Sequence, residues 1–201
     1  MAEVMDHVAI PEAPSFVSLL GEIAISLTQI ASNGYEAEVE RATEMLVSAF
    51  RAGHQLLVFG NGGSSADAQH ICGELVGRFH KLRPALPAIA LSSNQAVLTA
   101  WANDYSYDEV FARQVEAYGN PGDVAWGIST SGTSPNVVAA LRAARRRGLH
   151  TIALTGEGGG MAAEWAEVLL AVPLRETPRI QEIHLITYHS ICGAVERILF
   201  P

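Results

Sequence analysis

Residues 58–79 read VFGNGGSSADAQHICGELVGRF and carry the strongest structural signal of this chain. The pattern predicts a strand end, a turn rich in glycine and serine at residues 60–65, and then a helix. Glycines let backbone N–H groups come close to a ligand. A helix N-terminus behind them adds unpaired donors and the positive end of the helix dipole. The turn is therefore typical of an anion site, most often one for phosphate.

Two polar side chains follow on the predicted helix. His70 and Glu74 are four residues apart, so an imidazole and a carboxylate lie side by side on one helix face. Ser64, followed three residues later by Asp67, indicates a cap at the helix start. The alternative interpretation is a tight turn that precedes a buried histidine and a surface glutamate.

Two nucleotide-binding motifs do not match this turn. The dinucleotide fingerprint needs a third glycine where Ser65 stands, and the Walker A loop needs a lysine after its glycines. Lys81 is the only lysine of the chain. A phosphate here would therefore be held by backbone N–H groups and hydroxyls.

The composition narrows the class of protein. The chain has 201 residues, of which 49% are hydrophobic and 17% charged, which predicts one domain over residues 1–201. The net charge of −8 argues against a nucleic-acid partner. Residues 1–10 lack the basic region of a signal peptide, and no apolar run reaches the roughly 18 residues of a membrane span. We expect a cytoplasmic protein without a membrane partner, with Cys72 and Cys192 as small buried residues.

Helices and strands can be placed along the chain from their periodicity. Residues 1–52 hold two predicted helices, the first with an apolar seam spaced 4-3-4-3 from Phe16 to Ile30. Residues 53–201 alternate between strands and helices, which predicts a parallel sheet with helices on both faces. The predicted strands are 55–59, 86–91, 123–128, 150–154 and 168–172. The predicted helices between them include 95–102, ending at Asn103 and Asp104, then 108–118 and 135–147.

The last predicted helix, residues 178–199, differs from the others. Thr177 is its expected N-cap, with Pro178 in the first turn. Apolar residues surround it almost completely, so it must be buried on more than one side. Together with the two N-terminal helices, it suggests a helical layer shared between subunits.

A second polar turn, STSGTSP at residues 129–135, also follows a strand and opens a helix. It offers five hydroxyls where a cap needs one, although a polar loop with a single cap remains the alternative. Ligands of parallel sheets bind at the carboxyl ends of strands, near a switch in strand order. Both polar turns lie at such ends and could face one pocket.

The last helix also carries polar residues, which are Gln181, Glu182, His184 and His189. Such groups are costly in an apolar helix unless they are paired, and a lone histidine there is most often a satisfied core residue. Gln181 and His189 are eight residues apart, about 80° around the helix, so they could converge on one ligand. Glu182 and His184 could instead make structural hydrogen bonds.

Several of these segments together resemble the phosphoheptose isomerases, sugar isomerase (SIS) fold proteins of bacteria. The similar segments are GNGGSSADAQH (60–70), ND (103–104), STSGTS (129–134) and RIQEIH (179–184), with His189. The likeness covers nearly the whole chain, from about Phe16 to Pro201. The turns are shared across phosphosugar-binding SIS domains, whereas the combination of His70, Glu74, Gln181 and His189 is more specific.

The resemblance implies a fold and a reaction. The fold would be a three-layer, flavodoxin-like α/β domain with a five-stranded parallel sheet, in a homotetramer with active sites between subunits. The N-terminal helices would join an oligomeric helical bundle. The reaction would convert sedoheptulose 7-phosphate to D-glycero-D-manno-heptose 7-phosphate through an enediol, an early step towards ADP-heptose and the lipopolysaccharide core.

The resemblance also implies roles for individual residues. One Zn²⁺ per subunit would be held by His70, Glu74, Gln181 and His189, with Glu74 and His189 as the acid/base pair. Phosphate would be bound by Ser129, Thr130, Ser131 and Ser134. Sugar contacts would come from Asn61, Gly62, Gly63, Glu74, Asn103, Asp104 and Gln181. An aldose–ketose isomerisation needs a base at carbon and an acid or metal for the oxygens, which this set provides.

Two other functions fit the same fold. A replication-initiation regulator that binds the initiator protein resembles residues 102–111 and the terminal LFP, but its acid/base and ligand positions are degraded. Phosphosugar-sensing regulators usually carry a DNA-binding domain, for which this chain has no room. All four polar positions are present here, which favours the enzyme.

Overall fold

The computed structural model describes residues 15–31 and 33–201. The N-terminal residues in which no signal peptide was expected lie outside this part. The elements, in chain order, are α1 (Phe16–Ala31), α2 (Tyr35–Arg51), β1 (Leu56–Gly60), α3 (Gly63–Cys72), the π turn η1 (Gly73–Gly77), β2 (Ala88–Ala90), α4 (Gln95–Asp104), the 3₁₀ turn η2 (Tyr107–Glu109), α5 (Val110–Tyr118), β3 (Val124–Ser129), α6 (Pro135–Arg146), β4 (His150–Thr155), the 3₁₀ turn η3 (Gly160–Trp165), β5 (Val168–Ala171) and α7 (Thr177–Leu199).

The five strands form one parallel sheet in the order β2-β1-β3-β4-β5. Val58 of β1 is aligned with Ala90 of β2 on one side and with Trp126 of β3 on the other. The chain thus adds β2 to one side of β1 and the remaining strands to the other. This reversal between β1 and β3 is the switch point at which ligands of such sheets bind.

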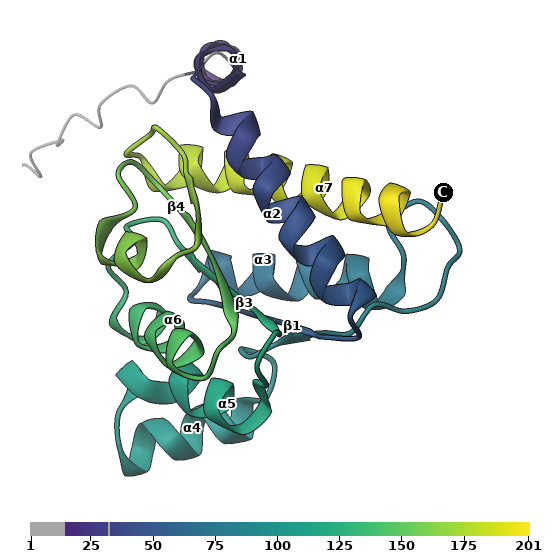
Figure 1. Cartoon of the computed structure of the whole chain (residues 1–201). Coiled ribbons are helices and arrows are strands. Elements are labelled where there is room, and N and C mark those ends of the chain that lie inside the picture. Colours follow the sequence, from purple (N-terminus) through teal and green to yellow (C-terminus); the bar gives the residue numbers. More distant parts are fainter. Residues whose placement is uncertain (1–14, 32) are drawn as a thin grey trace, which may run out of the picture.

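Helices cover both faces of the sheet, as predicted (Figure 1). Successive residues of a strand point to opposite faces, so Leu56 and Val58 join one core and Leu57 and Phe59 the other. The first core is closed by α2, α3 and α7, and the second by α5, α6 and η3. The result is the three-layer α/β arrangement expected from the sequence.

Helix α1 stands apart from these layers (Figure 1). Ile30 is its one buried residue among those described. Large apolar side chains remain exposed on α1 at Phe16, Val17, Leu20, Ile25 and Leu27, and on α7 at Leu185, Ile186 and Ile198. No helix formed by the described residues is long and apolar enough to cross a membrane.

The helix starts differ from those predicted. The N-cap of α3 is Gly62 rather than Ser64, because the turn needs a φ of +55° that only glycine adopts readily. The N-cap of α7 is Glu176, since the N–H of Ile180 bonds to its carbonyl at 2.9 Å, so Thr177 is already helical.

Helix α4 ends at Asp104, within the Asn103 and Asp104 pair that was expected to end it.

Candidate active site

The glycine-rich turn at residues 60–65 packs closely against β3 and against the side chain of Gln181 on α7. A Cβ added at Gly60 would lie 2.8 Å from Cβ of Ser64 and 2.9 Å from the carbonyl oxygen of Ile128. A Cβ at Gly63 would lie 2.5 Å from Nε2 of Gln181. These glycines therefore let the turn pack closely against β3 and against the amide of Gln181 on α7.

The second turn gathers hydroxyls at the end of β3. Ser129 Oγ lies 2.9 Å from Ser134 Oγ and 3.4 Å from Ser131 Oγ. Ser131 Oγ also accepts hydrogen bonds from the N–H of Thr133 at 3.2 Å and from its hydroxyl at 3.0 Å. The Thr130 carbonyl accepts from Gly156 N–H at 2.9 Å, which ties the turn to the end of β4. Four hydroxyls within reach of one another are suited to the several oxygens of a phosphate.

The two turns are joined to each other. Asn61 Nδ2 donates to Asn136 Oδ1 at 2.8 Å, and Asn136 Nδ2 donates to Asn61 Oδ1 at 2.9 Å. The Tyr107 hydroxyl donates to the same Asn61 oxygen at 3.0 Å. The turns after β1 and β3 thus lie side by side at the switch point, as the strand order requires.

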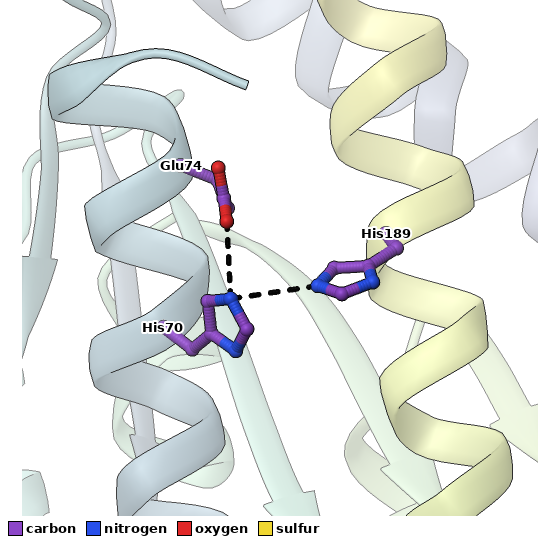
Figure 2. Close-up of side chains that lie close together, drawn as sticks. All are labelled: His70, Glu74 and His189. Atoms are coloured by element: carbon purple, nitrogen blue, oxygen red, sulfur yellow. Dashed lines mark hydrogen bonds and ion pairs between the residues drawn. The ribbon is translucent and has the colours of Figure 1, made fainter. Parts of the chain in front are cut away.

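His70, Glu74 and His189 form a compact polar cluster (Figure 2). His70 and Glu74 come from consecutive turns of α3 and η1, and His189 faces them from α7. His70 Nε2 lies 3.0 Å from Glu74 Oε1 and 3.5 Å from His189 Nε2. All three ligand atoms lie within 4.8 Å of one another, a spacing at which they could hold one metal ion.

Tyr188 and Asp67 lie on the Nδ1 side of the His70 ring, away from Glu74. The Tyr188 hydroxyl donates to Asp67 Oδ1 at 3.4 Å and lies 2.9 Å from His70 Nδ1. A hydroxyl has one proton, so His70 Nδ1 is the donor in the second bond whenever that proton is directed at Asp67. The lone pair of His70 Nε2 then faces the Glu74 carboxylate at 3.0 Å, a repulsive contact unless a proton or a cation lies between them.

Burial shifts the pKa of several groups in this cluster. Partial burial lowers the pKa of His189, and the neighbouring His70 lowers it further, while Glu74 opposes the shift. Burial raises the pKa of Asp67 despite its bonds to Tyr188 and the nearby His70. Burial and the Asp67 carboxylate also raise the pKa of Tyr188. A less basic His189 is better suited to hold a metal ion or to give up a proton near neutral pH.

Comparisons with known proteins agree with this geometry. Residues 20–156 match the family model described as the SIS domain. The phosphoheptose isomerase of Synechocystis sp. is 53% identical over 175 residues, which are 87% of this chain and 90% of that protein. The chain belongs to the phosphoheptose isomerase family.

Solved structures of the phosphoheptose isomerase family have the same fold. The structure of phosphoheptose isomerase GmhA from Neisseria gonorrhoeae matches with a TM-score of 0.84 at 39% identity, covering 90% of this chain and 96% of that one. The structure of a phosphoheptose isomerase from Francisella tularensis matches with a TM-score of 0.86 at 34% identity, with the same coverage.

His184 and Glu182, the other two polar residues predicted on α7, lie outside the polar cluster. His184 is fully buried, its Nε2 lies 3.1 Å from the Thr155 carbonyl oxygen, and burial lowers its pKa to about 4. Glu182 pairs with Arg179 at 2.8 Å. The structural hydrogen bond expected of His184 is confirmed, whereas Glu182 forms an ion pair.

Asn103 and Asp104 are exposed at the end of α4, where the Asn103 amide donates to Asp104 at 2.8 Å. No hydrogen bond within residues 15–31 and 33–201 links this pair to the two polar turns.

Several residues of the site have no clear sequence signal. Asn136 follows a proline in the first turn of α6, where an asparagine has many common uses. Tyr188 belongs to the apolar pattern of α7, so the sequence gives no sign that its hydroxyl has a polar role. Tyr107 lies in a short 3₁₀ turn without periodicity. Only Asp67, one turn before His70 on the same helix, could have been recognised from its spacing.

Proposed function

We propose that this chain interconverts sedoheptulose 7-phosphate and D-glycero-D-manno-heptose 7-phosphate, an early step towards ADP-heptose and the lipopolysaccharide core. The observation that carries this proposal is the cluster of His70, Glu74 and His189 beside two turns suited to phosphate and sugar. The relatives named phosphoheptose isomerase support the same reaction.

The phosphate would be held at the second turn. Its ligands would be the hydroxyls and N–H groups of Ser129, Thr130, Ser131 and Ser134. Asn61, Gly62, Gly63, Asn103, Asp104 and Gln181 would contact the sugar. The reciprocal bond of Asn61 and Asn136 keeps the two turns in register, so phosphate and sugar are bound as one unit.

The proton transfers would be carried out by Glu74 and His189. Glu74 takes a proton from C1 of the ketose, and the C2 oxygen gains a proton, which gives the enediol. The proton on the C1 oxygen then leaves, and Glu74 returns its proton to C2, which gives the aldose. His189 moves protons at the two oxygens, a role that suits a histidine with a lowered pKa.

A metal ion fits the same cluster, and we propose zinc. Two imidazoles and a carboxylate are common zinc ligands, and their ligand atoms lie within 4.8 Å of one another. Gln181 would be the fourth ligand, although its amide packs against Gly63 here. The ion would supply Lewis-acid stabilisation of charge on the sugar oxygens.

We also propose a homotetramer with active sites between subunits. The exposed apolar side chains of Phe16, Val17 and Ile25 on α1, and of Ile186 and Ile198 on α7, support it. The helical layer would cover these side chains. We place the protein in the cytoplasm, where sugar phosphates are made, with residues 1–201 as one SIS domain.

The test is turnover of sedoheptulose 7-phosphate by purified protein of defined metal content, followed by NMR of the sugar carbons. We expect an aldoheptose 7-phosphate to form, the activity to be lost on chelation, and the activity to return with zinc. Tight phosphosugar binding without turnover, in the presence of zinc, would instead indicate a binding protein.

A further inference from the structure

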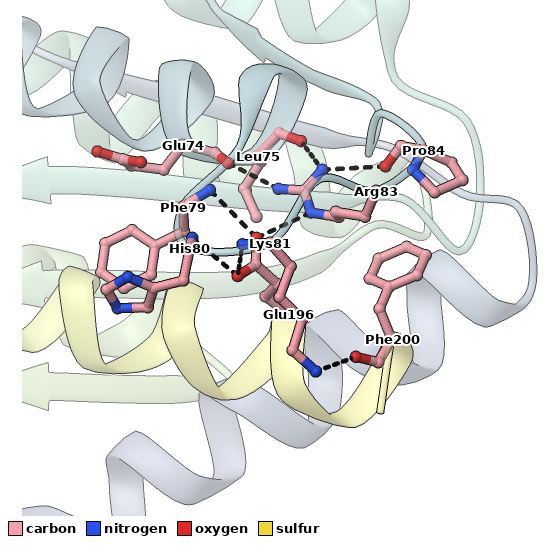
Figure 3. A network of polar contacts seen from close by, with 9 residues as sticks. All are labelled: Glu74, Leu75, Phe79, His80, Lys81, Arg83, Pro84, Glu196 and Phe200. Carbon is pink, nitrogen blue, oxygen red and sulfur yellow. Dashed lines mark hydrogen bonds and ion pairs between the residues drawn. The ribbon is translucent and has the colours of Figure 1, made fainter.

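A buried arginine holds the backbone around Glu74 (Figure 3), and the Leu86 N–H also donates to the Leu75 carbonyl at 3.0 Å. Glu74 lies in the π turn η1, and carbonyls at a helix end lack partners within the helix. Arg83 donates from one terminal nitrogen to the Glu74 carbonyl and from the other to the Leu75 carbonyl, both at 2.7 Å. The Arg83 side chain is only 1% exposed, so water does not compete for these bonds.

Arg83 is in turn held by Glu196 of α7. Arg83 Nε donates to Glu196 Oε2 at 3.1 Å, and the Glu196 side chain is 2% exposed. The same carboxylate accepts backbone N–H groups from His80 and Lys81 at 2.8 Å and from Phe79 at 3.1 Å. Burial alone raises the pKa of Glu196, but these N–H groups and Arg83 outweigh it, so the pKa lies below its usual range.

Glu196 and His189 are seven residues apart on α7, two helical turns on nearly the same face. Helix α7 therefore presents His189 directly and reaches the Glu74 backbone through Glu196 and Arg83. Phe79 strengthens this arrangement, because its ring lies 5.6 Å from the His189 ring between centroids.

We propose that Arg83 and Glu196 are positioning residues that hold the Glu74 carboxylate against His70 and His189. The proposal rests on the role of Glu74 in the proposed isomerase. Arg83 sets the position of the Glu74 main chain, and Glu196 fixes Arg83 to the helix that carries His189. Because a displacement of about 1 Å at a reacting group can cost about 100-fold in rate, this link determines whether Glu74 is in place for proton transfer.

The test compares Arg83→Lys and Glu196→Gln with the native protein. Lysine keeps the charge but lacks the planar fork that bonds two carbonyls, and glutamine keeps the shape but loses the charge. Arg83→Met combined with Glu196→Gln removes both charges together, so neither is left unpaired, and the amide oxygen can still accept from the N–H groups of His80 and Lys81. Arg41→Lys is the matched control, because Arg41 also joins a carboxylate, Glu38, to a backbone carbonyl, far from the site.

Two readouts are needed. The first is kcat and KM for sedoheptulose 7-phosphate. The second is the visible spectrum of the Co²⁺-loaded protein, because Co²⁺ binds the same N and O ligands as zinc. We expect the Arg83 and Glu196 variants to lose about 100-fold in kcat with little change in KM. We also expect their Co²⁺ spectra to shift in shape towards that of Glu74→Gln. A loss of folded protein would lower the amplitude without changing the shape.

The outcomes separate this inference from the proposed function. If the native protein is active, and the variants keep its kcat and its Co²⁺ spectrum, the positioning role is overturned and the isomerase stands. If the native protein is inactive, but the variant spectra shift towards Glu74→Gln, the isomerase fails and the positioning role is supported. An inactive native protein with unchanged variant spectra would overturn both.

Discussion

Asn61 and Asn136 exchange two side-chain hydrogen bonds, at 2.8 and 2.9 Å, across the switch point of the sheet. Each amide uses its oxygen as an acceptor and its nitrogen as a donor, so replacing either residue breaks both bonds. The pair fixes the distance between the turn that follows β1 and the turn that follows β3.

Asn136→Ala should therefore weaken substrate binding. Asn61 Nδ2 loses its acceptor, at a cost of about 1–3 kcal/mol, while Asn61 Oδ1 keeps only the bond from Tyr107. We expect kcat/KM to fall about 10- to 100-fold, mainly through KM. Steady-state kinetics with the heptose phosphate measures this. Asn120→Ala, at an exposed asparagine, is the control and should leave both constants unchanged. An unaltered KM in Asn136→Ala would mean that the pair does not order the substrate site.

Glu74→Gln should stop turnover and spare binding. The amide keeps the size of the carboxylate but cannot take a proton from carbon, so kcat should fall about 100- to 10,000-fold. Calorimetry should show sugar phosphate bound with an affinity close to that of the native protein. Glu116→Gln, at an exposed acid, is the control. Full activity in Glu74→Gln would remove Glu74 from the mechanism.

Tyr188→Phe should reduce metal affinity. Without the hydroxyl, His70 Nδ1 loses the bond that holds the imidazole ring with Nε2 towards the cluster, and we expect zinc affinity to fall about 10- to 100-fold. Competition with a chromophoric chelator measures it. Tyr35→Phe is a close control, because the Tyr35 hydroxyl also bonds to α7, at Thr187, 3.2 Å away. Equal zinc affinity in both variants would show that Tyr188 does not orient His70.

Gly132→Ala should damage the hydroxyl turn more than Gly158→Ala. Both glycines have positive φ, +65° and +75°, which costs an alanine roughly 1–2 kcal/mol. Only at Gly132 would the new Cβ also meet backbone, 2.1 Å from the Gly159 carbonyl oxygen, whereas Gly158 faces open space. Urea unfolding should show the larger loss for Gly132→Ala, together with weaker phosphate binding. Equal losses would mean that the turn relaxes freely.

His184 should make stability depend on pH. Its pKa is about 4 in the folded chain and about 6.5 when unfolded, so the unfolded state takes up the proton first as pH falls. The contribution of neutral His184 to the free energy of unfolding is complete above about pH 6.5 and falls towards pH 4. About 2 kcal/mol of it is lost between pH 7 and pH 5.

Urea unfolding of the metal-free protein at both pH values tests this. His184→Gln, which retains a donor for Thr155, should flatten the dependence. His150→Gln, at a half-exposed histidine, should not. A slope that is the same in all three proteins would assign the pH dependence to other groups.

Much of the fold could be predicted because it depends on local pattern. The alternation of strands and helices predicted the parallel sheet, and the strand expected at 123–128 is observed at Val124–Ser129. Helix starts were less predictable. The cap expected at Ser64 failed because a backbone angle at Gly62, rather than a side-chain hydrogen bond, starts α3.

The site was predicted where spacing along one helix carries the information. His70 and Glu74 are four residues apart, and the structure places them 3.0 Å apart. The positioning contacts depend instead on pairs distant in sequence. Arg83 and Glu196 are separated by 113 residues, and neither has a spacing that points to the other. Such pairs become visible only when the chain is folded.

Helix α7 contributes four contacts to the first turn and the polar cluster, and this limits how the protein can change. Gln181 packs against Gly63 of the first turn, Tyr188 contacts His70, His189 faces the cluster, and Glu196 bonds to Arg83. A translation or rotation of α7 would therefore disturb all four contacts at once. We therefore expect substitutions that change substrate specificity to fall in the loops after β1 and β3, while α7 stays unchanged.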